Sequence, residues 1–312
     1  MSWSFLIYIL PFLRKKLLDI PNHRSSHLQP TPRGGGIVFV LITFIVILFS
    51  LVFSFGLNSI DYSFYFVILF SAPLAFVGFV DDNSSLPAFF RYLMQLLTAA
   101  SLLLISPLFS PSFSYPLIYI FLLVTITAVI NFVNFMDGLD GLVASCMSVA
   151  IAGILIKVSA PLPLWILVGT LFGFLILNWS PAIVFMGDVG STFLGAVFAG
   201  LVLHAPTFLD ALSMIFVVTP LLGDAAVCVF RRWVVGQHIF QAHRLHLFQR
   251  LNQAGWPHAR VSLTYMSATA VLAVAMLAGG FFLVSVIAPL VLLVGVWLDQ
   301  RIAVPFSVAS KN

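Results

Sequence analysis

The stretch PLIYIFLLVTITAVINFVNFMDGLDGL, residues 116–142, shows the pattern on which the whole chain is built. Residues 116–136 carry no charged side chain, and a helix needs roughly 20 apolar residues to cross a bilayer core of about 30 Å. Amide and carboxylate side chains gather where this run ends, and Gly138 and Gly141 then break the helix. The stretch predicts a membrane-spanning helix that leads directly into a loop of ligand-binding side chains.

The composition of the full chain agrees with this pattern. Of the 312 residues, 61% are hydrophobic and 8% are charged, and the mean hydropathy is +1.13. Roughly a quarter of the residues of a soluble chain are charged. The deficit therefore excludes a cytosolic enzyme, a nucleic-acid-binding protein and a disordered interaction protein. The charged residues are 14 Lys and Arg and 10 Asp, with no Glu, and their positions become the main source of information.

Similar apolar runs recur along the chain and predict an all-α, polytopic integral membrane protein of about 10–11 transmembrane helices in one domain, residues 1–312. The runs are residues 3–13, 36–55, 64–80, 92–105, 116–136, 142–156, 162–179, 189–204, 211–230, 261–280 and 281–298. The first run is short, and it spans the membrane only if its helix continues past Arg14 with the basic side chains reaching the interface. It is not a secretory signal, because its positive charge follows the apolar stretch.

The charged residues separate by side of the membrane. With eleven spans, one set of loops comprises residues 14–35, 81–91, 137–141, 180–188, 231–260 and 299–312. This set holds 13 of the 14 Lys and Arg residues, and only Lys157 lies on the other side. The positive-inside rule places these loops in the cytoplasm and the N-terminus outside. Eight of the ten Asp residues lie on or near the same face, although the rule makes no demand on acidic residues.

Asp81 and Asp82 end one of these spans. Neighbouring carboxylates repel each other, and the end of a helix already carries partial negative charge, so the pair is unfavourable unless a cation or a proton compensates. A solvated helix end is the alternative interpretation. Arg91 follows closely in the sequence and could reach an anion bound beside the pair.

The end of the run 116–136 holds a second group, Asn131, Asn134, Asp137 and Asp140. A spacing of three residues places successive members on adjoining faces of a helix. Ligands that offer only oxygen suit a hard ion such as Mg²⁺, which favours phosphate-bearing substrates. The alternative is a polar turn in which these residues serve as caps.

A third group precedes the span 189–204, in the string FMGDVGST from Phe185. Asp188 could be the N-cap of that helix, and Gly187 would let a phosphate approach the amides of the helix N-terminus. Ser191 follows three residues later. The roles of cap and metal ligand are compatible with each other.

The long loop 231–260 contains the string HRLHLFQR from His243. His243 and His246 could bind zinc, but the loop offers no cysteine or suitably placed third histidine, and it is rich in Arg. We therefore expect His243, Arg244 and His246 to contact phosphate, with a lipid-headgroup patch as the alternative. Cys146 and Cys228 are too few for a disulfide framework or a zinc site, and we expect both to be packing residues.

The string PTPRGGG, residues 30–36, is the weakest signal. It does not match a phosphate-binding loop, because no strand precedes it and no Gly-Lys-Ser follows. We expect a flexible hinge into the next span, with Arg33 as a ligand contact. Taken together, we expect these groups to form an Mg²⁺ and anion site on the cytoplasmic face, as phosphoryl transfer requires. A nucleotide-linked donor would come from the cytosol, and an acceptor arriving through the bilayer would be a lipid.

At these residues the sequence closely resembles the polyprenyl-phosphate N-acetylhexosamine-1-phosphate transferases, over nearly the whole chain. The matching strings are residues 19–27, 30–36, 81–82, 131–142, 178–191 and 243–251. The resemblance implies an all-helical enzyme of the bacterial inner membrane. Such an enzyme moves a sugar 1-phosphate from a UDP-sugar to undecaprenyl phosphate and releases UMP. It implies Mg²⁺ as the cofactor, with Mn²⁺ as an alternative, the lipid bilayer as surroundings, no nucleic-acid partner, and a homodimer as one option.

The resemblance also implies residue roles. Asn134 and Asp188 would bind the metal, and Phe185 would stack on uracil. Asp81 or Asp82 would act on the acceptor phosphate, as a base or by orienting it. Asp137 and Asp140 would contact the nucleotide or hold the site together. The remaining substrate contacts would be His243, His246 and Arg244 at the donor diphosphate or sugar, Arg91 at a phosphate, and Asn131, Gly187, Ser191 and Arg33.

The family divides by sugar. The branch that begins peptidoglycan uses UDP-MurNAc-pentapeptide and has a His-rich string in the last cytoplasmic loop. The string HRLHLFQR is closer to the branch that begins O-antigen or common-antigen polysaccharides with UDP-GlcNAc or an epimer or deoxy analogue. Phospho-MurNAc-pentapeptide transfer remains the alternative. A transporter would bury its ionisable residues at mid-membrane, and the Asp-rich signature of a CDP-alcohol phosphatidyltransferase is not continued after Asp137.

Overall fold

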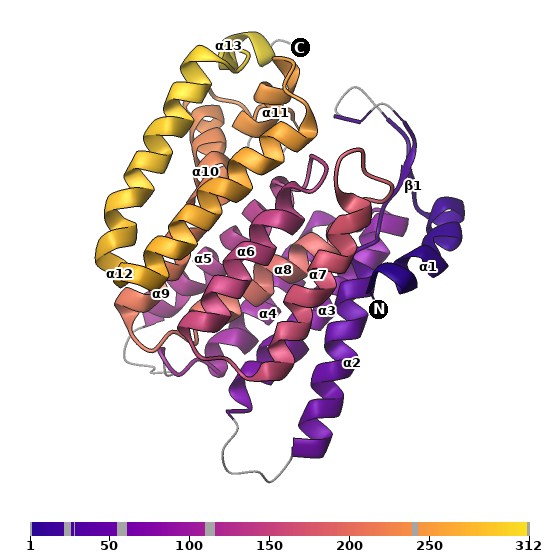
Figure 1. The fold of residues 1–312 in the computed structure, drawn as a ribbon, viewed down its shortest axis with the longest axis vertical. Coiled ribbons are helices and arrows are strands. Elements are labelled where there is room, and N and C mark those ends of the chain that lie inside the picture. Colours follow the sequence, from indigo (N-terminus) through magenta and orange to yellow (C-terminus); the bar gives the residue numbers. More distant parts are fainter. Residues whose placement is uncertain are drawn as a thin grey trace.

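The computed structural model of the chain is almost entirely helical (Figure 1). It describes residues 2–21, 26–27, 29–54, 61–109, 116–238 and 243–310. The strands in this part are β1 (Leu18–Asp19) and β2 (Thr31–Pro32), which form an antiparallel pair. The helices are α1 (Ser2–Lys16), α2 (Ile37–Ser54), α3 (Ser63–Asn83), α4 (Ala88–Leu104), α5 (Pro116–Phe135), α6 (Leu142–Lys157), the 3₁₀ helix η1 (Leu162–Leu164), α7 (Trp165–Asn178), α8 (Asp188–Val202), α9 (Phe208–Val217), α10 (Thr219–Val234), α11 (Leu247–Gln253), α12 (His258–Arg301) and α13 (Phe306–Ala309).

Each predicted apolar run falls on a helix. The chain changes direction sharply once within a run and once between the last two runs. The run 211–230 is divided between α9 and α10, whose axes differ by 78°. Pro220 follows this break, where a residue without a backbone N–H is tolerated at the start of a helix. The last two runs are both part of α12, which reverses direction at Gly280 (φ 59°, ψ −146°) (Figure 1). The predicted break at Gly279 and Gly280 is therefore confirmed.

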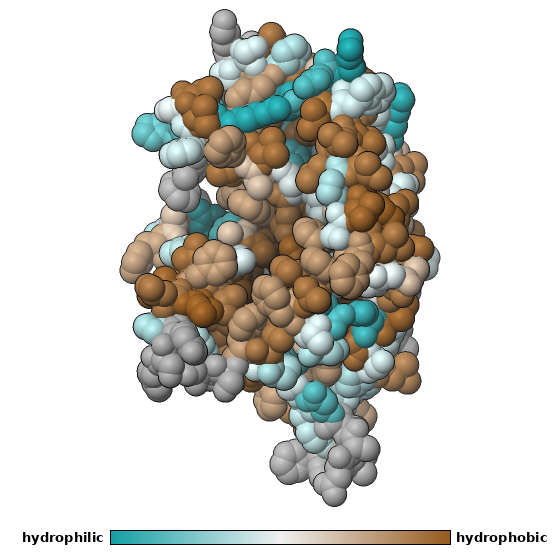
Figure 2. Space-filling view, turned by 90° about the vertical axis from the view of Figure 1, so that its left-hand side faces the viewer, coloured by the Kyte–Doolittle hydropathy of each residue, from teal (hydrophilic) through white to brown (hydrophobic). Residues whose placement is uncertain are grey.

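The surface of the molecule identifies a multi-pass membrane protein. Among the described residues, α3, α5 and α12 are each long and apolar enough to cross a bilayer, and the bent pair α9–α10 raises that number to four. Five shorter apolar helices accompany them: Ile37–Phe53, Ala88–Leu104, Leu142–Lys157, Leu162–Asn178 and Asp188–Val202. Large apolar side chains such as Phe76 and Phe282 are more than two-thirds exposed. Figure 2 shows hydrophobic residues over the middle of one face and hydrophilic residues toward its upper end. A soluble protein rarely exposes apolar patches of this extent.

Helix α1 is not among these candidate spans, and its last turn holds three basic residues. The predicted external N-terminus therefore stays a prediction. The centre of the bundle is α8, because every residue after its first is buried. It packs against α3 and α5, and a Cβ atom at Gly78 of α3 would lie 2.5 Å from the backbone of Asp188. Only glycine permits this approach, which brings the end of α3 against the start of α8.

Candidate active site

The segment before α2 fixes the loop that leads into α8. The amide of Gly35 donates to the carbonyl of Phe185 (2.9 Å), and the amide of Gly36 donates to the carbonyl of Met186 (2.9 Å). In return, the amide of Phe185 donates to the carbonyl of Pro32 (2.8 Å). The prediction of a flexible hinge at residues 34–36 is therefore wrong, because these glycines form a fixed backbone contact with the loop.

Asp82 caps the start of α8 from another helix. Its carboxylate accepts hydrogen bonds from the amides of Asp188 (3.2 Å) and Val189 (3.3 Å). Gly187, with φ +76°, occupies the N-cap position, and a Cβ atom there would overlap the Asp82 carboxylate. A carboxylate is favourable at this position because the first amides of a helix are unpaired and carry partial positive charge. The predicted N-cap role of Asp188 is therefore wrong, since Asp188 is the first residue of the helix.

Two arginines border the acidic side chains around the start of α8. Arg33 donates to the backbone carbonyl of Asp82 (2.6 Å), and its Nε atom lies 3.7 Å from the Asp82 carboxylate. Arg91 donates to Asp81 (2.9 Å) and lies 3.9 Å from Asp188. The structure thus brings Arg91, predicted to contact phosphate, and Arg33, predicted to contact a ligand, to the acidic group.

The carboxyl groups of Asp81 and Asp188 lie within hydrogen-bonding contact of each other. Asp81 also accepts from the amide of Leu86 (2.6 Å). Two carboxyl groups in contact require a shared proton or a cation between them. The predicted cluster therefore exists, but its two neighbouring members differ: Asp82 is committed to the amides of α8, whereas Asp81 faces Asp188.

The end of α5 completes the cluster. The side-chain oxygen of Asn134 accepts from the hydroxyl of Ser191 (2.5 Å), which ties α5 to α8. Asp137 lies in the turn after α5 and is half-buried. Burial, and secondarily the negative charge of Asp82, raise the pKa of Asp137 to about 7. Asn134, Asp137 and Asp188 thus surround the first turns of α8.

The side-chain oxygens of this site are suitable ligands for a hard divalent cation. Carboxylate and amide oxygens are the available ligands, and Mg²⁺ prefers oxygen. No three acidic side chains among the described residues form a closed ligand cluster. That openness is compatible with Mg²⁺, which usually keeps several waters and substrate phosphates as ligands.

Two of the predicted substrate contacts serve to hold the frame. Asn131 and Gln95 exchange two side-chain hydrogen bonds (3.1 and 2.7 Å) and so join α4 to α5. Asp140 is buried and accepts from the amide of Ala182 (3.2 Å), with His258 Nδ1 at 3.1 Å. Burial alone would raise the pKa of Asp140, but the interaction with His258 outweighs it and lowers the pKa. Of the two roles predicted for Asp140, this geometry fits the one of holding the site together.

Phe185 lies at the edge of the cluster, half-buried. Its ring contacts that of His27 edge to face, with centroids 4.8 Å apart. His27 received no role from the sequence, although it ends the string 19–27 that carried part of the resemblance. Residues 22–25 of that string lie outside the described residues.

The predicted histidine segment adjoins this site. His246 is the N-cap of α11, and its ring lies 6.5 Å from that of Phe135 at the end of α5. A Cβ atom at Gly138 would be 3.1 Å from the ring of Phe248, so the loop after α5 packs directly against α11. Arg244 belongs to the same segment, and its carbonyl accepts from Gln253 (2.9 Å).

Asp224 of α10 holds the histidine segment in place. It accepts from the amides of Leu247 (2.7 Å) and Phe248 (3.0 Å) and from the hydroxyl of Tyr265 (2.7 Å). Burial would lower the pKa of His246, but the Asp224 carboxylate, 3.7 Å from Nδ1, raises it to about 9. Burial, followed by the positive charge of His246, lowers the pKa of His243 to about 3. One imidazole is therefore cationic and the other neutral near pH 7.

An oxygen-rich acidic site flanked by arginines, at one end of a helical membrane bundle, defines an enzyme class that handles phosphates. The glycosyl transferase family 4 profile matches residues 64–205. The chain is 32% identical over 287 residues to a phospho-N-acetylmuramoyl-pentapeptide-transferase of Acaryochloris marina, covering 80% of this chain and 75% of the relative. A protein of the same name from Caldanaerobacter subterraneus is 31% identical, with 84% and 90% covered. An undecaprenyl-phosphate alpha-N-acetylglucosaminyl 1-phosphate transferase of Yersinia pestis is 27% identical, with 82% and 75% covered.

The chain belongs to the polyprenyl-phosphate N-acetylhexosamine-1-phosphate transferase family. It is therefore a membrane-embedded transferase of a sugar 1-phosphate.

Proposed function

We propose that the protein transfers an N-acetylhexosamine 1-phosphate from a UDP-sugar to undecaprenyl phosphate at the cytoplasmic face of the bacterial inner membrane, releasing UMP. One observation carries this proposal: Asp81, Asp137 and Asp188 converge on the start of α8 beside Arg33 and Arg91. The product would begin a surface polysaccharide of the O-antigen or common-antigen type.

The acceptor side of the reaction is assigned to Asp81. Its neighbour Asp82 is 4% exposed and bound to the α8 amides, so it positions α8 and is poorly placed to accept a proton. Asp81 would take a proton from the lipid phosphate or orient it, and Arg91 would hold that phosphate. An oxygen of the lipid phosphate then attacks the sugar-bearing phosphorus, and the bond from that phosphorus to the UMP oxygen breaks.

The donor side is assigned to residues of α5, α8 and the histidine segment. Asn134 and Asp188, with Asp137 beside them, would hold Mg²⁺ or alternatively Mn²⁺. The ion would neutralise charge on the diphosphate. Phe185 would stack on the uracil. His246, cationic near pH 7 because its pKa is about 9, would attract the diphosphate together with Arg244, while the neutral His243 would donate or accept a hydrogen bond.

A cavity of about 620 Å³ gives room for part of the polyprenyl chain. It lies between α10 and the two halves of α12, and the surface that it exposes is mostly apolar, with Val227, Val271 and Leu292 among the lining residues. Arg231 and Arg250, both paired with Asp299, lie along its wall. A lipid chain in this cavity would end close to the histidine segment, because Leu245 also lines it.

Phospho-MurNAc-pentapeptide transfer is the second candidate. It is favoured by the names of several matched relatives, which reach 32% identity against 27% for the N-acetylglucosaminyl relative. The string HRLHLFQR at residues 243–250 favours the first candidate, because its histidines are fewer than the peptidoglycan branch carries. The two candidates share the site and differ in the donor sugar.

A donor panel tests both candidates. The purified full chain is incubated in detergent with Mg²⁺, undecaprenyl phosphate and one labelled donor, either UDP-GlcNAc, UDP-GalNAc or UDP-MurNAc-pentapeptide. We expect UMP and a lipid-linked sugar with an N-acetylhexosamine donor. Turnover with UDP-MurNAc-pentapeptide alone would select the second candidate, and no UMP from any donor would refute the transferase assignment. Label retained on the protein without acceptor would replace direct attack by a two-step route through an aspartyl intermediate.

A further inference from the structure

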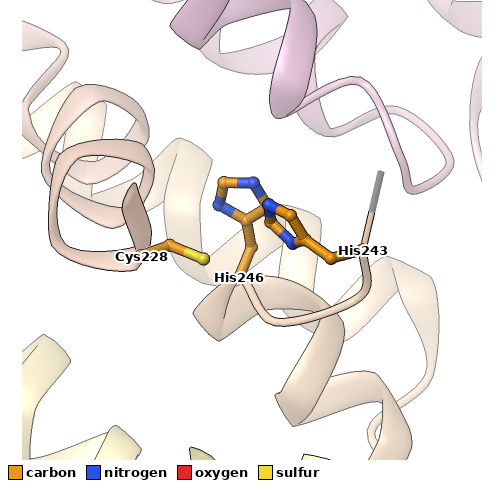
Figure 3. A group of neighbouring side chains, drawn as sticks. All are labelled: Cys228, His243 and His246. Carbon is orange, nitrogen blue, oxygen red and sulfur yellow. The ribbon is translucent and has the colours of Figure 1, made fainter. Parts of the chain in front are cut away.

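A second cluster of ligand-type side chains lies beside the acidic site. Cys228 of α10 and the two histidines before α11, His243 and His246, point toward one another (Figure 3). One potential ligand atom from each residue lies within 4.8 Å of the other two. The prediction that no cysteine is suitably placed beside these histidines is therefore wrong. Packing of α11 on α10 joins residues that the sequence keeps apart.

The chemistry of this cluster differs from that of the carboxylates around α8. Two imidazole nitrogens and a thiolate sulfur are ligands that Zn²⁺ favours, whereas Mg²⁺ selects oxygen. In a tetrahedral zinc site, bond lengths of about 2.0–2.3 Å place ligand atoms roughly 3.5 Å apart. Small side-chain rotations would bring atoms within 4.8 Å to that spacing, because the cluster is already assembled on two packed elements.

The buried ring of His246 holds a loosely paired nitrogen. His246 is 3% exposed, and among the described side chains its Nδ1 atom makes no hydrogen bond within 3.5 Å, with the Asp224 carboxylate 3.7 Å away. Buried polar atoms are nearly always closely paired, so this nitrogen can take a closer partner. Figure 3 shows one nitrogen of this ring turned toward the Cys228 sulfur. A metal ion between the thiol and the two rings would supply that closer partner.

The surroundings support the cluster. Asp224, one turn before Cys228 on α10, binds the amides that follow His246 and so fixes the position of its ring. His243 is also partly exposed, which gives an ion a route of entry.

We propose that Cys228, His243 and His246 form a binding site for a thiophilic divalent cation, of which Zn²⁺ is the expected occupant. Three protein ligands leave the fourth position open to water or to a substrate oxygen. One consequence rests on the proposed function: an ion held here would occupy the two rings assigned to the donor and would inhibit transfer.

The test uses the full chain in detergent, freed of metals and titrated with Co²⁺ as a spectroscopic substitute for Zn²⁺. We expect a thiolate-to-cobalt absorption band at one equivalent, abolished by Zn²⁺ and retained in excess Mg²⁺. Cys228→Ser should remove the band and weaken Zn²⁺ binding by roughly tenfold or more. Cys146→Ser is the matched control, because Cys146 is the other buried cysteine, lies on α6, and should leave both unchanged.

His243→Gln provides a second variant on a partly exposed side chain and should weaken Zn²⁺ binding even if Cys228→Ser fails to fold. A wild-type protein without the thiolate band, or a His243→Gln variant that binds Zn²⁺ as tightly as the wild type, would overturn the site. Transfer activity is measured separately. A thiolate band together with transfer that Zn²⁺ does not inhibit would confirm the site and refute the donor role of the two histidines.

Discussion

Two neighbouring regions of the molecule differ in how completely their charged side chains are paired. Around the start of α8, Asp81 and Asp188 are close to each other, and among the described residues they share one arginine, Arg91. Beside α11, by contrast, the cationic His246 faces Asp224, which also accepts three hydrogen bonds. The first region is electrostatically incomplete without a ligand, whereas much of the second is paired within the protein. Substitutions in the first should therefore alter catalysis, and substitutions in the second should alter stability as well.

The largest effect is expected at Asp188. Asp188→Ala removes the carboxylate that faces both Asp81 and the proposed metal, and we expect kcat to fall on the order of a thousandfold, as for other groups that stabilise charge in a transition state. The thermal unfolding midpoint should change little, because the α8 cap belongs to Asp82. The measurement is UMP release over a range of Mg²⁺ concentrations.

The control for this prediction is Asp210→Asn. Asp210 forms an ion pair with Lys157 (2.8 Å) on the side predicted to face away from the site. It should leave kcat unchanged. Normal turnover by Asp188→Ala would show that Asp188 has no role in the reaction. It would also contradict the proposed difference between the two regions.

The pH dependence of stability tests the paired region. The pKa of His246 is about 9 in the folded protein, above its usual value near 6.5. Its contribution is therefore fully present below about pH 6.5 and is lost as the pH rises toward 9, with a magnitude on the order of 3 kcal/mol. Unfolding midpoints measured in detergent with EDTA should fall over this range.

His246→Gln should flatten that part of the profile. His243→Gln is the matched comparison, because a pKa of about 3 keeps His243 neutral throughout the range, and it should preserve the decline. A wild-type profile that is flat between pH 6.5 and 9 would show that Asp224 does not hold a charged imidazole.

The same contrast explains what the sequence could and could not predict. The helices and most of the acidic site could be predicted, because apolar runs report membrane spans directly and each short string of Asp and Asn lies at or near one end of a span. Asn134 and Asp137, for instance, are close in the sequence and remain close in the fold. The length of a run says little about a bend, however, so the division of α9 from α10 was not anticipated.

Contacts between distant helices were not accessible from the sequence. The hydrogen bond from the Asp188 amide to the Asp82 carboxylate joins residues 106 positions apart. The sequence suggested Asp188 as the N-cap of α8, whereas in the fold Asp82 caps the amide of Asp188. Cys228 reaches His243 and His246 only because α11 packs on α10. In both cases residue type was visible, but the partner is set by tertiary packing, which neither periodicity nor spacing encodes.

Comparing Asp81 with Asp82 tests the division of roles within a single pair. Asp81→Asn should lower kcat about a hundredfold, the usual range for an acid–base group, with little change in the unfolding midpoint. Asp82→Ala should cost about 1 kcal/mol of stability through loss of the α8 cap and lower activity indirectly. Thermal unfolding and initial rates at saturating donor separate the two. The reverse pattern would make Asp82 the group that acts on the acceptor phosphate.

The smallest effect is expected at Phe185, at the margin of the incomplete region. Phe185→Ala should raise the donor KM roughly tenfold, within the energy of stacking between a base and an aromatic ring, and leave kcat nearly unchanged, because the uracil is held equally before and during reaction. Phe76→Ala is the control, since Phe76 is 71% exposed on the outer surface of α3 and should change neither constant. The loop before α8 is held through the backbone of Phe185, so truncating the ring should leave the acidic cluster in place. A fall in kcat with an unchanged KM would therefore show that the ring orders the reacting groups and does not bind the uracil.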